Sequence, residues 1–144
     1  MSIFNTIQIN ASGLTLERFK MDTISTNIAN INTTRTEEGG PYRRREVLFE
    51  ESLKNEVNHL SGKREKTSSG VRVTGIYEDD QDFKSVYDPS HPDADADGYV
   101  LMPNVNMVDE MIDLIGTQRS YEANVTALNT SKAMLMKALQ ITKA

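Results

Sequence analysis

The sequence contains no cysteine and no tryptophan, and only 6% of its 144 residues are aromatic. The absence of cysteine excludes a disulfide scaffold, a zinc site built from thiolates and a cysteine nucleophile. With an apolar content of 38%, the chain has few residues from which to build a large globular core. Its length fits one ordinary domain, or a small domain joined to extended elements.

Positive charge and long hydrophobic runs are also scarce. The chain has 16 basic and 21 acidic residues, a net charge of −5, which gives no electrostatic basis for binding nucleic acid. No stretch is long and apolar enough to span a membrane. The N-terminus lacks the basic start, apolar block and cleavage site of a secretory signal, so we expect export, if it occurs, to use another route.

Residues that commonly build catalytic or metal sites are few. His59 and His91 are the only histidines, and neither belongs to the sequence pattern of a metal pair or a nucleophile relay. No nucleophile elbow is present, and Gly39-Gly40 is too short to cradle a phosphate. We therefore expect no enzymatic activity, no cofactor and no metal.

One acidic loop partly matches a calcium-binding pattern. Asp93, Asp95 and Asp97 occupy the first, third and fifth positions of an EF-hand loop, and Gly98 occupies the sixth. The twelfth position, where a bidentate glutamate belongs, is Asn104. A solvated acidic loop that ends in a turn is therefore favoured over a calcium site.

Residues 43–45 are three consecutive arginines, which could bind phosphate. Glu46, Glu50 and Glu51 follow closely, and the chain is acidic overall. A solvated strand or a cluster of interface salt bridges is therefore the favoured interpretation.

The N-terminal residues 2–31 carry apolar side chains at intervals of seven. Such a repeat requires a slightly underwound helix that keeps one seam against a partner helix, and Ser2 is a suitable N-cap. Off the seam, this stretch has only four charged residues, whereas a coiled coil in water normally exposes Glu and Lys. We predict a helix whose outer faces are covered by other chains. Its seam residues are Phe4, Ile7, Leu14, Met21 and Ile28.

A second long helix is predicted in residues 104–144, with Asn104 or Asn106 as its N-cap. Its apolar side chains also recur at sevens, with Gln118 and Lys132 as polar interruptions. The two helices should meet as an antiparallel pair. The seam residues of the second helix are Met111, Leu114, Tyr121, Val125, Leu128, Leu135 and Leu139.

The middle of the chain holds most of the charge and reads as a small antiparallel β unit of three to five strands. Residues 50–60 are ambiguous because Leu53, Val57 and Leu60 lie at helical spacing, and residues 61–70 read as a connector. The predicted strands are residues 42–49, 71–77, 83–87 and 99–102.

Together these patterns predict an α+β fold with two parts. Residues 1–33 and 104–144 form a discontinuous helical domain, an antiparallel coiled coil, and residues 34–103 form a central loop and β-rich region. Because the helical pair has few apolar contacts for its length, we expect both ends to be poorly ordered in the monomer and to order on assembly.

Several motifs in the chain resemble those of bacterial flagellar axial proteins, the family of rod, hook and hook-associated subunits. The pattern A-N-x-x-T ends the first helix, and G-G-P-Y-R-R, Y-D-P-S-H-P-D-A, G-Y-V-L-M-P-N-V-N and R-S-Y-E-A-N follow in order. The internal motifs are most similar to those of a proximal-rod subunit. The residues that carry these motifs are Ala29, Asn30, Thr33, Pro41, Tyr42, His91, Pro92, Pro103, Asn104 and Asn106.

This resemblance implies a structural subunit that stacks helically through its terminal helices into the axial shaft that carries motor torque. Implied partners are further copies of the chain, other proximal and distal rod subunits, the rod-to-motor-ring adaptor and the flagellar type III export apparatus. The implied location is the basal-body rod, which spans the periplasm. Neither catalysis nor a cofactor is implied.

Two other functions stay open from the sequence. The chain could be a coiled-coil adaptor that binds a single partner without polymerising, in which case it would form a complex of defined size. A calcium-responsive module is the third interpretation, and calorimetry with calcium would test it.

Overall fold

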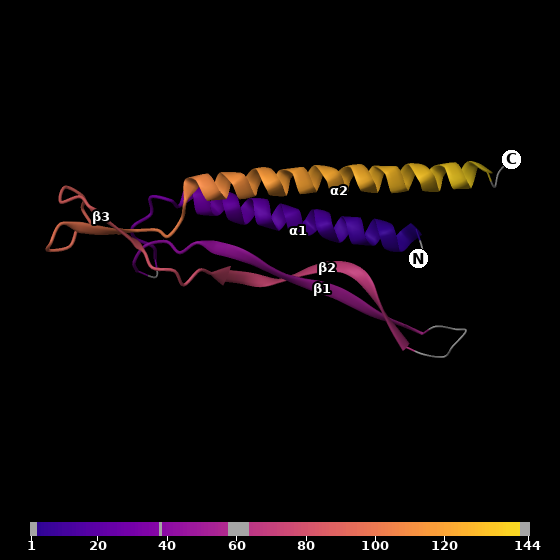
Figure 1. Cartoon of the computed structure of the whole chain (residues 1–144), viewed down its shortest axis with the longest axis horizontal. Helices are drawn as coiled ribbons and strands as arrows, with labels where there is room; N and C mark the ends of the chain where they lie inside the picture. The colour runs from indigo at the N-terminus through magenta and orange to yellow at the C-terminus, as the bar shows by residue number, and fades with distance from the viewer. Residues whose placement is uncertain (1–2, 38, 58–63, 142–144) are drawn as a thin grey trace. The chain divides into compact units, whose positions relative to one another are not determined.

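A computed structural model describes residues 3–37, 39–57 and 64–141. Its elements are the helices α1 (Ile3–Ala29) and α2 (Met107–Ile141) and, between them, the strands β1 (Arg45–Val57), β2 (Arg64–Glu78), β3 (Lys84–Tyr87) and β4 (Tyr99–Met102) (Figure 1). This arrangement confirms the predicted α+β class. The predicted cap Ser2 lies outside the described residues. Neither described helix is long and apolar enough to cross a membrane.

The contacts within the chain divide it into two compact units. The first unit is Met1–Phe19, Leu48–Gly75 and Thr117–Ala144, and the second is Lys20–Val47 and Ile76–Gly116. Each unit therefore combines a stretch of both helices with strand residues.

In each unit, a stretch of α1 lies beside a stretch of α2 that runs in the opposite direction (Figure 1). In the first unit, Gly13 faces Asn124, since a Cβ added to Gly13 would lie 3.0 Å from the Asn124 amide nitrogen. In the second unit, Asn27 Nδ2 donates to Glu110 Oε2 at 3.0 Å. The separation in sequence between Gly13 and Asn27 on α1 equals that between Glu110 and Asn124 on α2. The two contacts therefore share one antiparallel register.

Asparagines mark the ends of the helices in the second unit. Asn106 Oδ1 accepts from Val108 N at 3.1 Å, which confirms Asn106 as the N-cap of α2. Its amide nitrogen donates to Asp109 Oδ2 at 2.7 Å, and this carboxylate suits the positive first turn of the helix. At the end of α1, Asn30 Nδ2 donates to Thr26 O at 2.9 Å, and the same oxygen accepts from Asn30 N at 3.1 Å.

Strands β1 and β2 pair as a two-stranded sheet with 13 and 15 residues, and they run in opposite directions (Figure 1). The prediction that residues 61–70 are a connector is wrong for 64–70, and the ambiguous stretch 50–57 is strand. Pairing of the two strands overrides the weak local preference here, and an exposed ion pair between Arg72 on β2 and Glu50 on β1 accompanies it. Contacts with α1 add to this, since Lys54 Nζ donates to Gln8 Oε1 at 3.2 Å.

The backbone of β2 approaches α1 closely at Gly70. This glycine has φ +109°, and a Cβ added to it would overlap the Ser12 side chain of α1. Ser12 Oγ donates to Ile9 O at 2.7 Å and accepts from Val71 N at 3.1 Å. Only glycine combines this backbone conformation with so short an approach.

Strands β3 and β4 form a second, separate two-stranded sheet within the second unit. They are antiparallel, and Tyr87 pairs with Tyr99 in an edge-to-face contact with ring centroids 5.2 Å apart. Val100 of β4 is 2% exposed, as is Val105 just before α2. Within the described residues, the predicted single β unit is therefore replaced by two sheets.

Candidate functional site

The most buried polar side chains of the second unit form one cluster between α1, the start of β1 and α2. Asn27 is 1% exposed and Glu110 is 0% exposed. Asn27 Nδ2 donates to both Glu110 Oε2 and Arg45 O, at 3.0 and 2.9 Å. Asn27 Oδ1 accepts from Tyr42 Oη and Arg45 N, at 2.9 and 3.0 Å. One asparagine thus ties α1 to both other elements.

Arg44 completes this polar cluster, which we define as Asn27, Tyr42, Arg44 and Glu110. The Arg44 guanidinium pairs with Glu110 and Glu46, and its Nη2 lies 3.4 Å from Asp113 Oδ2. Burial alone would lower the pKa of Arg44, but the hydrogen bonds and charges of Glu110 and then Glu46 raise it above its usual value. Arg44 therefore stays charged, which compensates the charge of the fully buried Glu110 carboxylate.

Burial also raises the pKa of the Tyr42 phenol, and the nearby charge of Arg45 partly opposes this effect. Its hydroxyl therefore remains a hydrogen-bond donor to Asn27 at neutral pH. The Tyr42 side chain is thus a neutral donor in the cluster.

Asn104, in the segment before α2, forms hydrogen bonds with the backbone next to the polar cluster. Its Oδ1 accepts from Arg44 N at 2.8 Å, and its Nδ2 donates to Asp79 O and Gln81 O at 3.1 and 3.4 Å. Of the two predicted N-caps, Asn104 therefore binds backbone groups elsewhere in the second unit, while Asn106 caps the helix.

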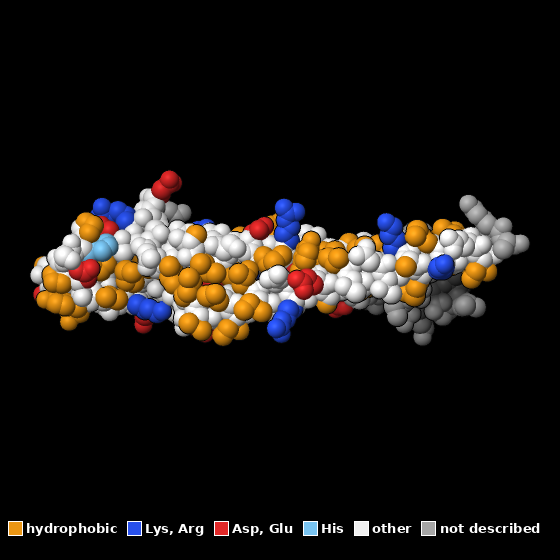
Figure 2. Space-filling model, turned by 90° about the horizontal axis from the view of Figure 1, so that it is seen from above, with side chains coloured by type: hydrophobic (Ala, Val, Ile, Leu, Met, Phe, Trp, Pro, Cys, Tyr) orange, Lys and Arg blue, Asp and Glu red, His pale blue; other side chains and the backbone are white. Residues whose placement is uncertain are grey.

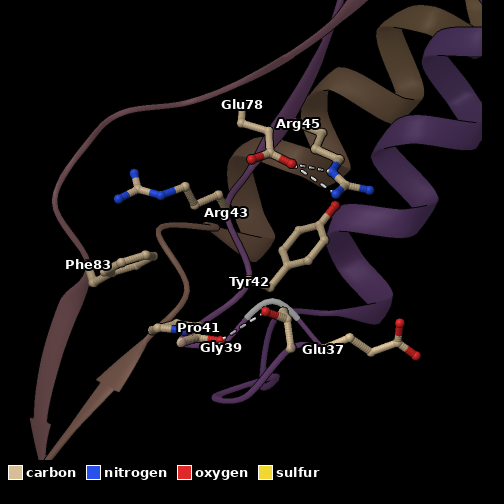
Figure 3. Close-up of a pocket in the computed structure, with 10 residues that line it drawn as sticks. Glu37, Gly39, Pro41, Tyr42, Arg43, Arg45, Glu78 and Phe83 are labelled. Carbon is tan, nitrogen blue, oxygen red and sulfur yellow. Dashed lines mark hydrogen bonds and ion pairs between the residues drawn. The ribbon is translucent and has the colours of Figure 1, made fainter.

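A hollow of about 440 Å³ lies beside the cluster in the second unit. Figure 3 shows Arg45 and Glu78 reaching toward each other above the Tyr42 ring, and their closest atoms are 2.8 Å apart. Arg43 points the other way, with its guanidinium carbon 4.5 Å from the centre of the Phe83 ring. Both arginines are thus held by partners of the same unit, Arg45 by an ion pair and Arg43 by a ring.

The acidic loop makes contacts with its own unit. Asp93 accepts from Thr34 Oγ1 at 2.8 Å, and Asp95 Oδ1 accepts from the backbone nitrogens of Asp97 and Tyr99 at 3.0 and 2.8 Å. These are turn-stabilising bonds typical of aspartate. Among the described residues, no three His, Cys, Asp or Glu side chains come together as a metal-binding group.

The predicted seam of α1 is only partly covered within the chain. Ile7, Leu14, Met21 and Ile28 are half-buried, and the side chain of Phe4 is outside those that the structure describes. The buried apolar side chains of this helix are instead Leu16 and Ile24, at 5% and 9% exposure.

On α2, most of the predicted seam residues are half-buried, and two of them are exposed. Met111 and Leu139 are 49% and 56% exposed, so they do not lie in a buried seam of the isolated chain. The row of α2 that α1 covers is polar. In it, Asn124 lies against the backbone of Gly13, and Glu110 accepts a hydrogen bond from Asn27. The half-buried residues are Leu114, Tyr121, Val125, Leu128 and Leu135, and the polar row is Glu110, Thr117, Asn124 and Ser131.

The ten motif residues named from the sequence lie in the second unit, while the motif R-S-Y-E-A-N at residues 119–124 lies in the first. Asn30 and Thr33 form the turn after α1, where Thr33 Oγ1 donates to Asn30 Oδ1 at 3.1 Å and Thr33 O accepts from Tyr42 N at 3.0 Å. His91 Nδ1 accepts from Asp93 N at 3.1 Å. The remaining motif residues are Ala29 at the end of α1, Pro41 beside the hollow, exposed Pro92, buried Pro103, and Asn104 and Asn106 described above.

The sequence patterns did not predict that Asn27, Arg44 and Glu110 would contact one another. A signal was present, because Glu110 begins a row that continues at sevens through Thr117 and Asn124. That row was passed over because its side chains are polar, and a seam is usually recognised by apolar residues.

The arrangement is suited to holding elements together. Among the described residues, no buried side-chain nitrogen or oxygen lacks a hydrogen-bond partner. The cluster fixes the register of α1 against α2 and anchors the start of β1, in the way that buried polar groups specify one pairing of helices.

Comparison with known proteins agrees with this geometry. Residues 7–35 match the family model described as flagella basal body rod protein, and residues 96–141 match the model of the flagellar basal body rod FlgEFG protein C-terminal region. These matches cover most of both helices.

Full-length relatives extend the match through the strands. The flagellar basal-body rod protein FlgC of Bacillus subtilis is 47% identical over 99% of this chain and 100% of its own length. The FlgC proteins of Borreliella burgdorferi and Salmonella typhimurium are 43% and 36% identical, each over 98% of both chains. The chain therefore belongs to the FlgC family of flagellar basal-body rod proteins.

Proposed function

We propose that this chain is a structural subunit of the proximal rod in the bacterial flagellar basal body. It polymerises through its terminal helices into the axial shaft that transmits motor torque to the distal rod and hook. The observation that carries this proposal is the pair of antiparallel helices in a chain that matches rod proteins from end to end. The pair leaves large apolar side chains exposed on α2, as an assembly subunit requires.

The composition of the outer helix faces supports the same role. The exposed side chains of α1 are mostly Thr, Gln, Ala and Ser, so neighbouring subunits can approach this helix without burying many charges. We further propose that the partners include other proximal and distal rod subunits, the rod-to-motor-ring adaptor and the type III export apparatus. The location that follows is the rod within the periplasm.

The substitution Leu128→Asp tests the proposal. Leu128 is half-buried in the apolar row of α2, so a carboxylate there should disrupt the helix pair and block incorporation into the rod. Cells that carry only this variant should not swim, and basal bodies isolated from them should lack the chain. The matched control is Leu128→Met, which keeps an apolar side chain of similar volume and should support swimming.

Normal motility with Leu128→Asp would contradict the proposed role. A complex of defined mass with one partner, and no trace of the chain in purified basal bodies, would favour the adaptor function instead.

A further inference from the structure

The small sheet of β3 and β4 exposes one apolar face. In its register, Tyr87 pairs with Tyr99 and Ser85 pairs with Leu101. Paired residues, and residues two positions apart on a strand, point to the same side of a sheet, so these four side chains share one face, which we call the tyrosine face. Its three large side chains are 46% to 64% exposed, whereas Val100 on the opposite face is 2% exposed. Figure 2 shows hydrophobic side chains with acidic ones among them at the left of the view, where β3 and β4 lie.

The two rings of the tyrosine face are held in place although they are exposed. Each ring contacts the other edge to face, as described above. The Tyr87 ring also lies against the backbone of Gly98, since a Cβ added to Gly98 would come within 3.0 Å of Tyr87 Cε2. Rings that are already fixed lose little conformational freedom when a partner covers them. Rigid, exposed tyrosines of this kind are therefore suited to anchor a binding partner.

A hollow of about 360 Å³ adjoins the tyrosine face. Tyr99 and Leu101 line it together with the carboxylates of Asp93 and Asp95, so its lining combines apolar surface with negative charge. Arg35 also lines the hollow and lies 3.7 Å from Asp93, but its side chain is 79% exposed. A hollow of this composition fits the aliphatic stem of a lysine or arginine whose charged end reaches a carboxylate.

Carboxylates dominate the surroundings of the tyrosine face. The loop of residues 88–98 connects the tyrosine ends of the two strands, and it contains four aspartates but no lysine or arginine. Of these four, only Asp93 forms an ion pair with another residue of the described ranges. Hydrogen bonds from Ser90 lower the pKa of Asp88, which keeps this carboxylate ionised at neutral pH. The charges of Asp88, Asp95 and Asp97 are therefore available to a basic partner.

We propose that the tyrosine face and its hollow form a docking surface for a basic segment of another protein. Apolar side chains of the partner cover the two rings and Leu101, and a lysine or arginine of the partner enters the hollow toward Asp95. Apolar burial drives the contact, and the aspartates of the loop select for positive charge. The surface consists of strand and loop residues rather than helix, so the proposal does not depend on the rod role.

The charges of the loop disfavour two other occupants. A contact between the tyrosine faces of two copies would bring the four aspartates of one copy against those of the other, which is unfavourable. A bound metal ion is disfavoured too, because within the described ranges no three acidic or histidine side chains come together. The favoured occupant is therefore a protein segment of opposite charge.

Fluorescence anisotropy with three labelled peptides tests the proposal on the purified full chain. The first peptide alternates lysine with leucine, the second alternates glutamate with leucine, and the third alternates lysine with serine. We expect the lysine–leucine peptide to bind. Each of the others should bind at least about tenfold more weakly, because one lacks positive charge and the other lacks apolar side chains. Salt at about 0.5 M should weaken binding of the lysine–leucine peptide.

Two variants locate the binding surface. Asp97→Lys reverses an exposed charge at the tyrosine end of the sheet, and Leu101→Thr removes apolar surface but keeps a side chain suited to a strand. Each should weaken binding of the lysine–leucine peptide at least about fivefold. The matched controls in the same unit are Asp22→Lys on α1 and Ile76→Thr on β2, which also change exposed residues and should bind within about twofold of the unmodified chain. Circular dichroism should show unchanged secondary structure in all four.

Equal binding of the lysine–leucine and glutamate–leucine peptides, or an equal loss in the controls, would overturn the proposal. Absence of binding of the lysine–leucine peptide at about 1 mM chain would also overturn it. Self-association of the unmodified chain that Leu101→Thr abolishes, and that the lysine–leucine peptide does not displace, would assign the tyrosine face to a second copy instead.

Discussion

At the scale of single residues, the second unit depends on one fully buried carboxylate. Glu110 accepts from Asn27 and pairs with Arg44, whose side chain is 20% exposed. A buried pair of this kind adds little net stability compared with apolar residues of the same shape. Its loss is nevertheless costly, because the remaining charge keeps its desolvation penalty without its partner.

We expect Glu110→Ala to lower the free energy of unfolding by about 3 kcal/mol, since Arg44 then loses its buried partner. Glu110→Gln should have a smaller effect because the amide oxygen can still accept a hydrogen bond. Urea unfolding followed by circular dichroism measures both. The control is Glu122→Ala, an exposed glutamate on the same helix, which should change the free energy by less than about 0.5 kcal/mol. Equal effects at the two glutamates would contradict the role of the cluster.

The sequence predicted some residues of this region and missed others for a physical reason. Asn106 was predicted as a cap because a cap depends on residues a few positions away along the chain. Asn27 and Glu110 meet only after the two helices have paired, and nothing local to either residue indicates the other.

At the scale of elements, α2 has an apolar row and a polar row, each repeating at sevens. No pattern in the sequence favours the polar row, since apolar residues usually mark a coiled-coil seam. The structure covers Thr117 and Ser131 and exposes Met111, because α1 presents Gly13 and Asn27 to this side of α2. Small and polar residues fit such a close approach.

The different exposures of Thr117 and Met111 predict opposite outcomes for two matched substitutions. Thr117→Asp places an unpaired carboxylate at a site that is 8% exposed, and it should lower the free energy of unfolding by about 2 kcal/mol or more. Met111→Asp, at 49% exposure, should leave the free energy of the isolated chain within about 0.5 kcal/mol. Thermal unfolding of dilute protein compares them. A larger loss for Met111→Asp would restore the apolar row as the seam.

The strands show the same limit of local reasoning. Strands β3 and β4 were predicted closely because turn residues bound them, as Gly98 does with φ +81°. The ends of β1 and β2 were missed because their residues are polar and take strand conformation only through pairing and contact with α1.

At the scale of the whole molecule, buried apolar side chains are unevenly divided between the units. Among the described residues, only Leu16 belongs to the first unit, while Ile24, Tyr42, Val100 and Val105 belong to the second. Local stability follows the burial of apolar side chains and hydrogen-bonded polar groups. The first unit should therefore be the one that is completed by neighbouring subunits.

Amide hydrogen exchange tests this difference. In dilute protein, we expect the α1 amides of residues 5–19 to exchange faster than those of residues 20–29. Assembly should protect the faster set, because neighbouring helices then cover it. Strong protection throughout α1 in the dilute chain would show that the helix pair is stable without neighbours.

The contact between Gly70 and Ser12 has a mechanical consequence in a rotating shaft. A sliding motion of β2 along α1 would carry Ser69 or Val71 to the place of Gly70, and each of these residues has a Cβ where no room exists. To slide along the axis of α1, strand β2 would therefore first have to move away from the helix. Because the Ser12 side chain occupies the space that a Cβ at Gly70 would take, β2 cannot shift along α1 by one residue without a steric clash. The contact therefore lets α1 and β2 transmit force to each other along the helix axis.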